Sequence, residues 1–168
     1  MESRAQLFGH PIHQMLISFP VALFVTAVGL DVVFYFSEAP QWALFSFYLI
    51  GIGIVTGVLA ALFGLIDWSA IPKSTRARRI GTLHGLGNLV VTALFCISWY
   101  LRRQSPLTPS HGAMLISGAG FILLCITVWL GGELVDRLGV GVDNGANVNA
   151  SSSISTKVSV RTANRPTM

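Results

Sequence analysis

The sequence predicts an all-α membrane protein, an antiparallel bundle of four transmembrane helices with both termini in the cytoplasm. Apolar residues make up 52% of the 168 residues and charged residues only 11%, whereas a soluble domain carries about a quarter charged residues. The apolar residues gather in four runs, each long enough, at about 1.5 Å per residue, to cross a bilayer. Short polar stretches separate the runs, so consecutive helices are expected to be antiparallel.

The first two predicted spans cover residues 13–36 and 42–66. Pro20 lies inside the first span and predicts a kink, which membrane helices tolerate better than soluble ones. The second span contains no charged residue and is rich in small ones. The spacings Gly53/Gly57 and Ala60/Gly64 allow two helix backbones to approach closely in lipid, so we expect this helix to pack tightly.

The third and fourth predicted spans cover residues 80–101 and 111–134. A basic loop precedes the third span, and glycine and acidic residues end the fourth. The transmembrane domain therefore covers residues 9–143. Residues 144–168 are rich in Asn, Ser and Thr, which predicts a flexible, disordered polar tail.

The distribution of basic residues predicts the orientation of the bundle. Cytoplasmic loops of membrane proteins carry an excess of Lys and Arg, so the side richer in basic residues is assigned to the cytoplasm of a bacterial inner membrane. The net charge of +4 is read as membrane orientation and not as a nucleic-acid surface, because the basic residues do not share one face. The side of the termini holds Arg4, Lys73, Arg76, Arg78, Arg79 and Arg137, against Arg102 and Arg103 on the other side.

Five ionisable residues share one predicted depth in the membrane. They lie within about two helical turns of the cytoplasmic boundary, and every helix contributes at least one, which favours a common site over scattered interfacial residues. Each alone is also explained by capping or by pairing with the basic loop. The five are His10, His13, Asp67, His84 and Glu133.

Two cofactor chemistries fit these residues, and a third function needs no cofactor. His13 and His84 are the available pair of axial ligands for a haem b, and Asn88, one turn beyond His84, is placed to hold a ligand histidine. All five residues together are ligands that suit zinc, iron or manganese. The same side chains also suit a proton relay or a quinone or lipid head group. At the opposite boundary, we expect Asp31 to form a structural ion pair with Arg102 or Arg103.

Several motifs together resemble the bacterial membrane proteins of domain-of-unknown-function family 2231. The resemblance covers residues 9–143, with Gln14 where family members usually have a second proline after the histidine. It implies a four-helix membrane domain without an established activity, and an association with redox domains. The motifs are Gly9-His10-Pro11-Ile12-His13, Gly64-Leu65-Ile66-Asp67-Trp68, His84 with Asn88, and Gly131-Gly132-Glu133-Leu134-Val135.

The leading functional hypothesis is a non-enzymatic redox protein that binds haem or a metal and exchanges electrons with a quinone or a partner protein. The first alternative is a small transporter or proton-coupled carrier, although no inverted repeat is evident. The second alternative is a structural subunit of a membrane complex or a homo-oligomer. No nucleophile–base set or phosphate loop predicts an enzyme.

Overall fold

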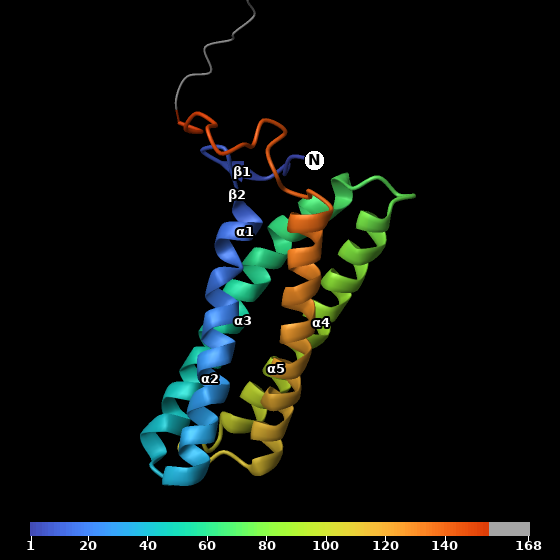
Figure 1. The fold of residues 1–168 in the computed structure, drawn as a ribbon. Coiled ribbons are helices and arrows are strands. Elements are labelled where there is room, and N and C mark those ends of the chain that lie inside the picture. Colours follow the sequence, from blue (N-terminus) through green and yellow to red (C-terminus); the bar gives the residue numbers. More distant parts are fainter. Residues whose placement is uncertain (155–168) are drawn as a thin grey trace, which may run out of the picture.

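A computed structural model describes residues 1–154 of the chain, and these residues form a bundle of long helices with a small hairpin at the N-terminus (Figure 1). Four helices are long and apolar enough to cross a membrane, which confirms the predicted all-α fold with four transmembrane helices. The first of them is divided into α1 and α2. The elements are β1 (Gln6–Leu7), β2 (His10–Pro11), α1 (Ile12–Leu16), α2 (Ser18–Ser37), α3 (Pro40–Ala70), α4 (Arg76–Arg102), α5 (His111–Gly132) and the π-helical turn η1 (Glu133–Arg137).

The chain runs up and down the bundle, so one end holds the N-terminus, the loop between α3 and α4 and the segment after η1 (Figure 1). We call this the terminal end. The connections α2–α3 and α4–α5 lie at the opposite end. The helices extend a few residues beyond the predicted spans; α3, for example, continues past Asp67 to Ala70. A helix does not begin or end where the apolar residues do, because its ends are set by capping groups. At the start of α4, for example, the Thr75 hydroxyl accepts a hydrogen bond from the Arg78 amide.

The interruption between α1 and α2 occurs at Ile17, one turn before Pro20. Proline has no amide hydrogen to donate to the carbonyl of Leu16, so the regular helical hydrogen bonding is broken there. The structure thus shows a local interruption of the helix next to Pro20, and the predicted kink stays a prediction. Ile17 itself keeps helical backbone angles.

A short β-hairpin and the segment after η1 cover the terminal end. Residues 6–11 form the two-stranded hairpin, with Gly9 in its turn at a φ of 84° that favours glycine. The amino group of Met1 donates to the carbonyl of Gly139 at 2.7 Å. Residues 144–154 form turns beside the hairpin, where Ser153 contacts His10. The remainder of the predicted flexible tail, residues 155–168, lies outside the described residues.

The centre of the bundle is apolar and is built around one aromatic pair. The rings of Phe24 in α2 and Phe95 in α4 stack with centroids 3.9 Å apart and planes within 5° of parallel. Both side chains are almost fully buried. They meet across the middle of the bundle because their helices are opposite one another, with α3 and α5 between them. The surrounding buried side chains are Ala27, Ile50, Val91 and Leu124.

The two helical hairpins, α1–α3 and α4–α5, repeat the same contacts. In the first helix of each, a histidine is followed eleven residues later by phenylalanine and seven residues after that by a charged residue. In the second helix, a glycine packs on the phenylalanine: an added Cβ would lie 2.6 Å from the Phe24 ring at Gly53 and 3.0 Å from the Phe95 ring at Gly120. The hairpins run in the same direction, so the bundle is a parallel internal repeat. The repeated triplets are His13, Phe24 and Asp31 in the first hairpin and His84, Phe95 and Arg102 in the second.

Candidate functional site

His13 and His84 meet inside the terminal end of the bundle. Their ring centroids are 6.4 Å apart and their planes are nearly perpendicular, at 88°. Both side chains are half-buried. We call this pair the histidine layer. It is the part of the predicted five-residue set that the fold brings together.

Each histidine is held in the same way by the second helix of its own hairpin. His13 Nδ1 lies 2.8 Å from the carbonyl oxygen of Ala60, and His84 Nδ1 lies 2.8 Å from that of Thr127. A carbonyl only accepts, so Nδ1 carries a hydrogen in both rings, and in a neutral ring held this way Nε2 has the lone pair. This is the tautomer that binds metals through Nε2, with the other ring nitrogen anchored to the backbone.

Glycines make the space for both rings. An added Cβ at Gly64 would lie 2.8 Å from the His13 ring, and one at Gly131 would lie 3.1 Å from the His84 ring. Each glycine follows the hydrogen-bonded carbonyl residue by one helical turn. The Ala60/Gly64 spacing predicted close helix packing, and the structure shows that the packing partner of Gly64 is a histidine side chain.

Asn88 lies beside His84, one turn further along α4. Its Nδ2 is 3.2 Å from His84 Nε2 and 3.0 Å from the His84 carbonyl, and its Oδ1 is 3.0 Å from the Thr127 hydroxyl. Asn88 therefore lies against the His84 ring and contacts Thr127, the residue whose carbonyl also contacts that ring. His13 Nε2 has no such neighbour within residues 1–154.

The two predicted carboxylate ligands are engaged elsewhere. Asp67 accepts hydrogen bonds from the Ser3 hydroxyl at 2.7 Å and from the Arg4 amide at 2.8 Å, so it fixes the N-terminal segment to α3. Glu133, the first residue of η1, forms an ion pair with Arg76, the first residue of α4, with an N···O distance of 2.6 Å. These residues lie at the same end of the bundle, as their equal depth predicted. Their side chains leave their helices in different directions, so they contact different partners.

His10 also lies apart from the histidine layer. It is exposed in strand β2, and its Nε2 is 3.2 Å from the Ser153 hydroxyl. Within residues 1–154, no three side chains of His, Cys, Asp or Glu are placed to share a metal ion. The five-residue metal site is therefore not assembled in this structure, and the pair His13 and His84 is what remains of it.

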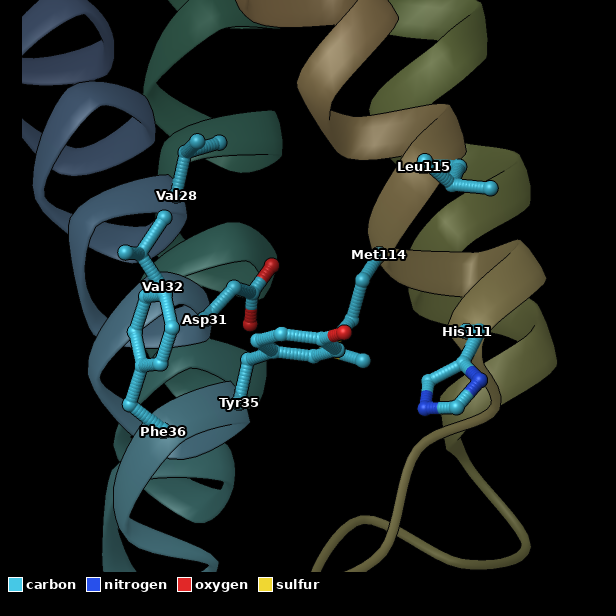
Figure 2. Close-up of a pocket in the computed structure, with 8 residues that line it drawn as sticks. All are labelled: Val28, Asp31, Val32, Tyr35, Phe36, His111, Met114 and Leu115. Atoms are coloured by element: carbon cyan, nitrogen blue, oxygen red, sulfur yellow. The ribbon is translucent and has the colours of Figure 1, made fainter.

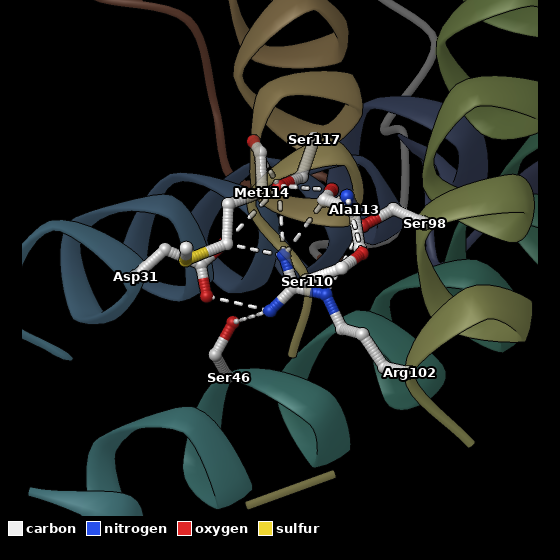
Figure 3. Close-up of polar contacts among 8 residues, drawn as sticks. All are labelled: Asp31, Ser46, Ser98, Arg102, Ser110, Ala113, Met114 and Ser117. Atoms are coloured by element: carbon white, nitrogen blue, oxygen red, sulfur yellow. Dashed lines mark hydrogen bonds and ion pairs between the residues drawn. The ribbon is translucent and has the colours of Figure 1, made fainter. Parts of the chain in front are cut away.

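A second polar cluster is buried at the opposite end, at the other limit of the repeat. Arg102 and Asp31 form a two-bond ion pair with both N···O distances at 2.6 Å, as predicted from the sequence (Figure 3). The Arg102 side chain is 0% exposed. The remaining guanidinium hydrogens go to the hydroxyls of three buried serines, so all five N–H groups are satisfied. These hydroxyls are those of Ser46, Ser98 and Ser117, and with Asp31 and Arg102 they form what we call the ion-pair layer.

The three serines of the ion-pair layer were not predicted. Serine is common at helix contacts in membranes, so a single one carries little information. The repeat was a usable signal, because aligning His13 with His84 aligns Phe24 with Phe95 and Asp31 with Arg102. That alignment predicts that the two charged residues lie opposite each other, with the neighbouring helices around them.

The fold and these two layers define a class of protein: a four-helix membrane protein with polar groups on its central axis. The family model described as predicted membrane protein (DUF2231) matches residues 9–144. The chain belongs to this family, which confirms the resemblance found in its motifs. No curated protein and no solved structure matches the chain.

Proposed function

We propose that this membrane protein binds haem b through His13 and His84 and acts in electron transfer. The observation that carries the proposal is the histidine layer itself. Two histidines from different helices lie with their ring centroids 6.4 Å apart, each with Nδ1 hydrogen-bonded to a backbone carbonyl. Axial ligation of haem between helices uses neutral histidines anchored in this way.

The separation of the rings supports a shared metal. A metal–nitrogen bond is about 2.0–2.1 Å, and a ring centroid lies roughly 1 Å beyond the nitrogen, so rings on opposite sides of one metal have centroids about 6 Å apart. The observed separation is 6.4 Å. Ligation at His84 would replace its contact with Asn88, whose amide keeps the His84 carbonyl and the Thr127 hydroxyl as partners.

Haem is favoured over a bare divalent cation by the number of protein ligands required. Zinc in proteins takes three or four protein ligands, and the predicted carboxylates are held by other groups. Haem supplies four nitrogen ligands of its own, so two histidines complete its coordination.

The transporter alternative has less support. A carrier needs a polar path or a central site that is alternately open to each side. The stacked rings of Phe24 and Phe95 and the buried apolar side chains around them separate the histidine layer from the ion-pair layer. The repeat is parallel, which some transporters also have, but it encloses an apolar centre.

We also propose that the terminal end faces the cytoplasm of a bacterial inner membrane. Six basic residues of the described chain were assigned to that end, including Arg76 and Arg78 at the start of α4. Arg102, counted on the other side, is buried in the ion-pair layer and contributes no loop charge. The difference in exposed basic charge between the two ends is therefore larger than the sequence indicated.

The test is the absorbance spectrum of the protein purified from cells with ample haem supply, air-oxidised and then reduced with dithionite. We expect a Soret band that shifts and sharpens on reduction, and its loss in both His13→Ala and His84→Ala. His111→Ala is the matched control, because His111 lies at the opposite end of the bundle, and it should keep the band.

Two results would overturn the proposal. One is a spectrum without a Soret band in the unmodified protein after haem is added to it. The other is a haem content unchanged in His84→Ala. Thermal unfolding of each variant, followed by circular dichroism, separates loss of the ligand from loss of the fold.

A further inference from the structure

A cleft opens between α2 and α5 at the end opposite the histidine layer. Its volume is about 430 Å³. Figure 2 shows Asp31 and Tyr35 from α2 and Met114 from α5 directed into the space between the two helices, with His111 at its edge. Apolar side chains such as Val28 line the rest. The cleft thus combines apolar walls with a few polar groups, which is typical of small-molecule sites.

The internal repeat supplies an equivalent location between α4 and α3, and there the space is filled. Trp99 occupies the position equivalent to Val28, and Phe47 the position equivalent to Met114. The Trp99 and Phe47 rings stack, with centroids 5.3 Å apart and planes within 9°. One half of the molecule therefore fills this location with two stacked rings, and the other half has Val28 and Met114 at the same two positions.

The space beside two equivalent glycines, Gly51 and Gly118, also differs between the filled and the open location. An added Cβ at Gly51 would lie 3.0 Å from Nε1 of Trp99. At the equivalent Gly118, no heavy atom lies within 4 Å of an added Cβ. The space that the Trp99 ring fills beside Gly51 is therefore open beside Gly118, and the rings of Tyr35 and His111 line the cleft without filling that space.

We propose that the cleft between α2 and α5 binds the ring of a membrane quinone. A flat ring is what the chain itself places in the equivalent location, and stacked rings are stabilising beyond their buried area. The Tyr35 hydroxyl and the His111 ring, whose rings are 5.9 Å apart, are donors suited to quinone carbonyl oxygens. The apolar wall of α2 continues along the helix and suits an isoprenoid tail. This inference does not depend on haem binding.

The charges favour a neutral head group over the phosphate of a phospholipid. Asp31 lines the cleft, and its charge is balanced by Arg102, so this ion pair offers a phosphate no net positive charge. Arg102, the nearest cation to Asp31, has all its N–H groups engaged within the ion-pair layer. Among the described side chains that line the cleft there is no lysine or arginine.

The test measures equilibrium binding of decylubiquinone to the purified full-length protein in lipid nanodiscs. We expect saturable binding at one site per chain. The double variant Val28→Trp with Met114→Phe copies the closed half and should weaken binding at least tenfold. Val25→Trp is the matched control, because Val25 is an exposed residue of α2 that does not line the cleft, and it should leave binding unchanged.

A second variant covers the case in which the double variant does not fold. Val32 lines the cleft and is 52% exposed, so Val32→Trp should fold normally and weaken binding. Equal binding by the unmodified protein, the double variant and Val32→Trp would overturn the proposal. So would complete displacement of decylubiquinone by equimolar decanol, since the cleft would then take any alkyl chain. Absence of saturable binding would have the same consequence.

Discussion

The histidine layer and the ion-pair layer are each built from a pair of equivalent residues of the two hairpins, and they lie about 27 Å apart along the first helix at 1.5 Å per residue. The two layers differ in how completely their polar groups are hydrogen-bonded. In the ion-pair layer, every hydrogen-bonding group of Asp31 and Arg102 has a partner inside the bundle, and both side chains are almost fully buried. In the histidine layer the rings are half-buried, and His13 keeps its Nε2 without a partner in residues 1–154. The first arrangement suits structural stability and the second suits binding.

The largest expected effect of a single change is in the ion-pair layer. Arg102→Met leaves the Asp31 carboxylate buried without its counter-ion, and breaking such a pair costs about 3–5 kcal/mol. We expect a correspondingly lower free energy of unfolding in a detergent-denaturation titration. The double variant Asp31→Leu with Arg102→Met should recover most of the loss, because it removes both charges. A single variant as stable as the unmodified protein would mean that the pair is not buried as described.

Replacing a residue of the histidine layer is expected to lower the free energy of unfolding much less than Arg102→Met does. His13→Ala removes one hydrogen bond to the carbonyl of Ala60, with a net cost of about 0.5–1.5 kcal/mol, and the packing of a half-buried ring on Gly64, but it leaves no buried charge unpaired. The titration used for Arg102→Met measures this directly. A loss as large as that of Arg102→Met would show that the histidine layer is a structural element and would remove the contrast between the layers.

The smallest expected effect is at the exposed ion pair of the terminal end. Arg76 and Glu133 lie 2.6 Å apart, but the Arg76 side chain is 54% exposed. Such pairs contribute about 0–1 kcal/mol and are screened by salt. Arg76→Ala should therefore lower stability only slightly at low ionic strength and not at all at high ionic strength. A salt-independent loss would indicate that Glu133 has a further role.

Hydropathy was sufficient to predict the four helices, because the cost of exposing polar groups to lipid acts on whole segments. It was also sufficient to predict which residues share an end of the bundle, since depth follows directly from position along a helix. It did not give the direction of a side chain around the helix axis. Asp67 and Glu133 have the predicted depth but contact Ser3 and Arg76 instead of the histidines.

The ion pair of Asp31 and Arg102 was predicted because the two residues have similar predicted depths in the membrane and opposite charges. The pairing of His13 with His84 was predicted as a possible ligand pair, and the structure places the rings in contact distance. The glycine positions behind them were recognised only as close-packing sites. A comparison of the two halves of the sequence would have assigned those glycines to the histidine rings, because Gly64 and Gly131 hold equivalent positions.

The opposite charges at one matched position also make the two hairpins complementary and not interchangeable. Two copies of the second hairpin assembled in the same way would bring two Arg102 guanidinium groups together in the membrane with no counter-ion, and two copies of the first would do the same with Asp31. Neither half can therefore dimerise with itself in this geometry. The charge pair therefore favours association of the first hairpin with the second over association of either hairpin with a copy of itself.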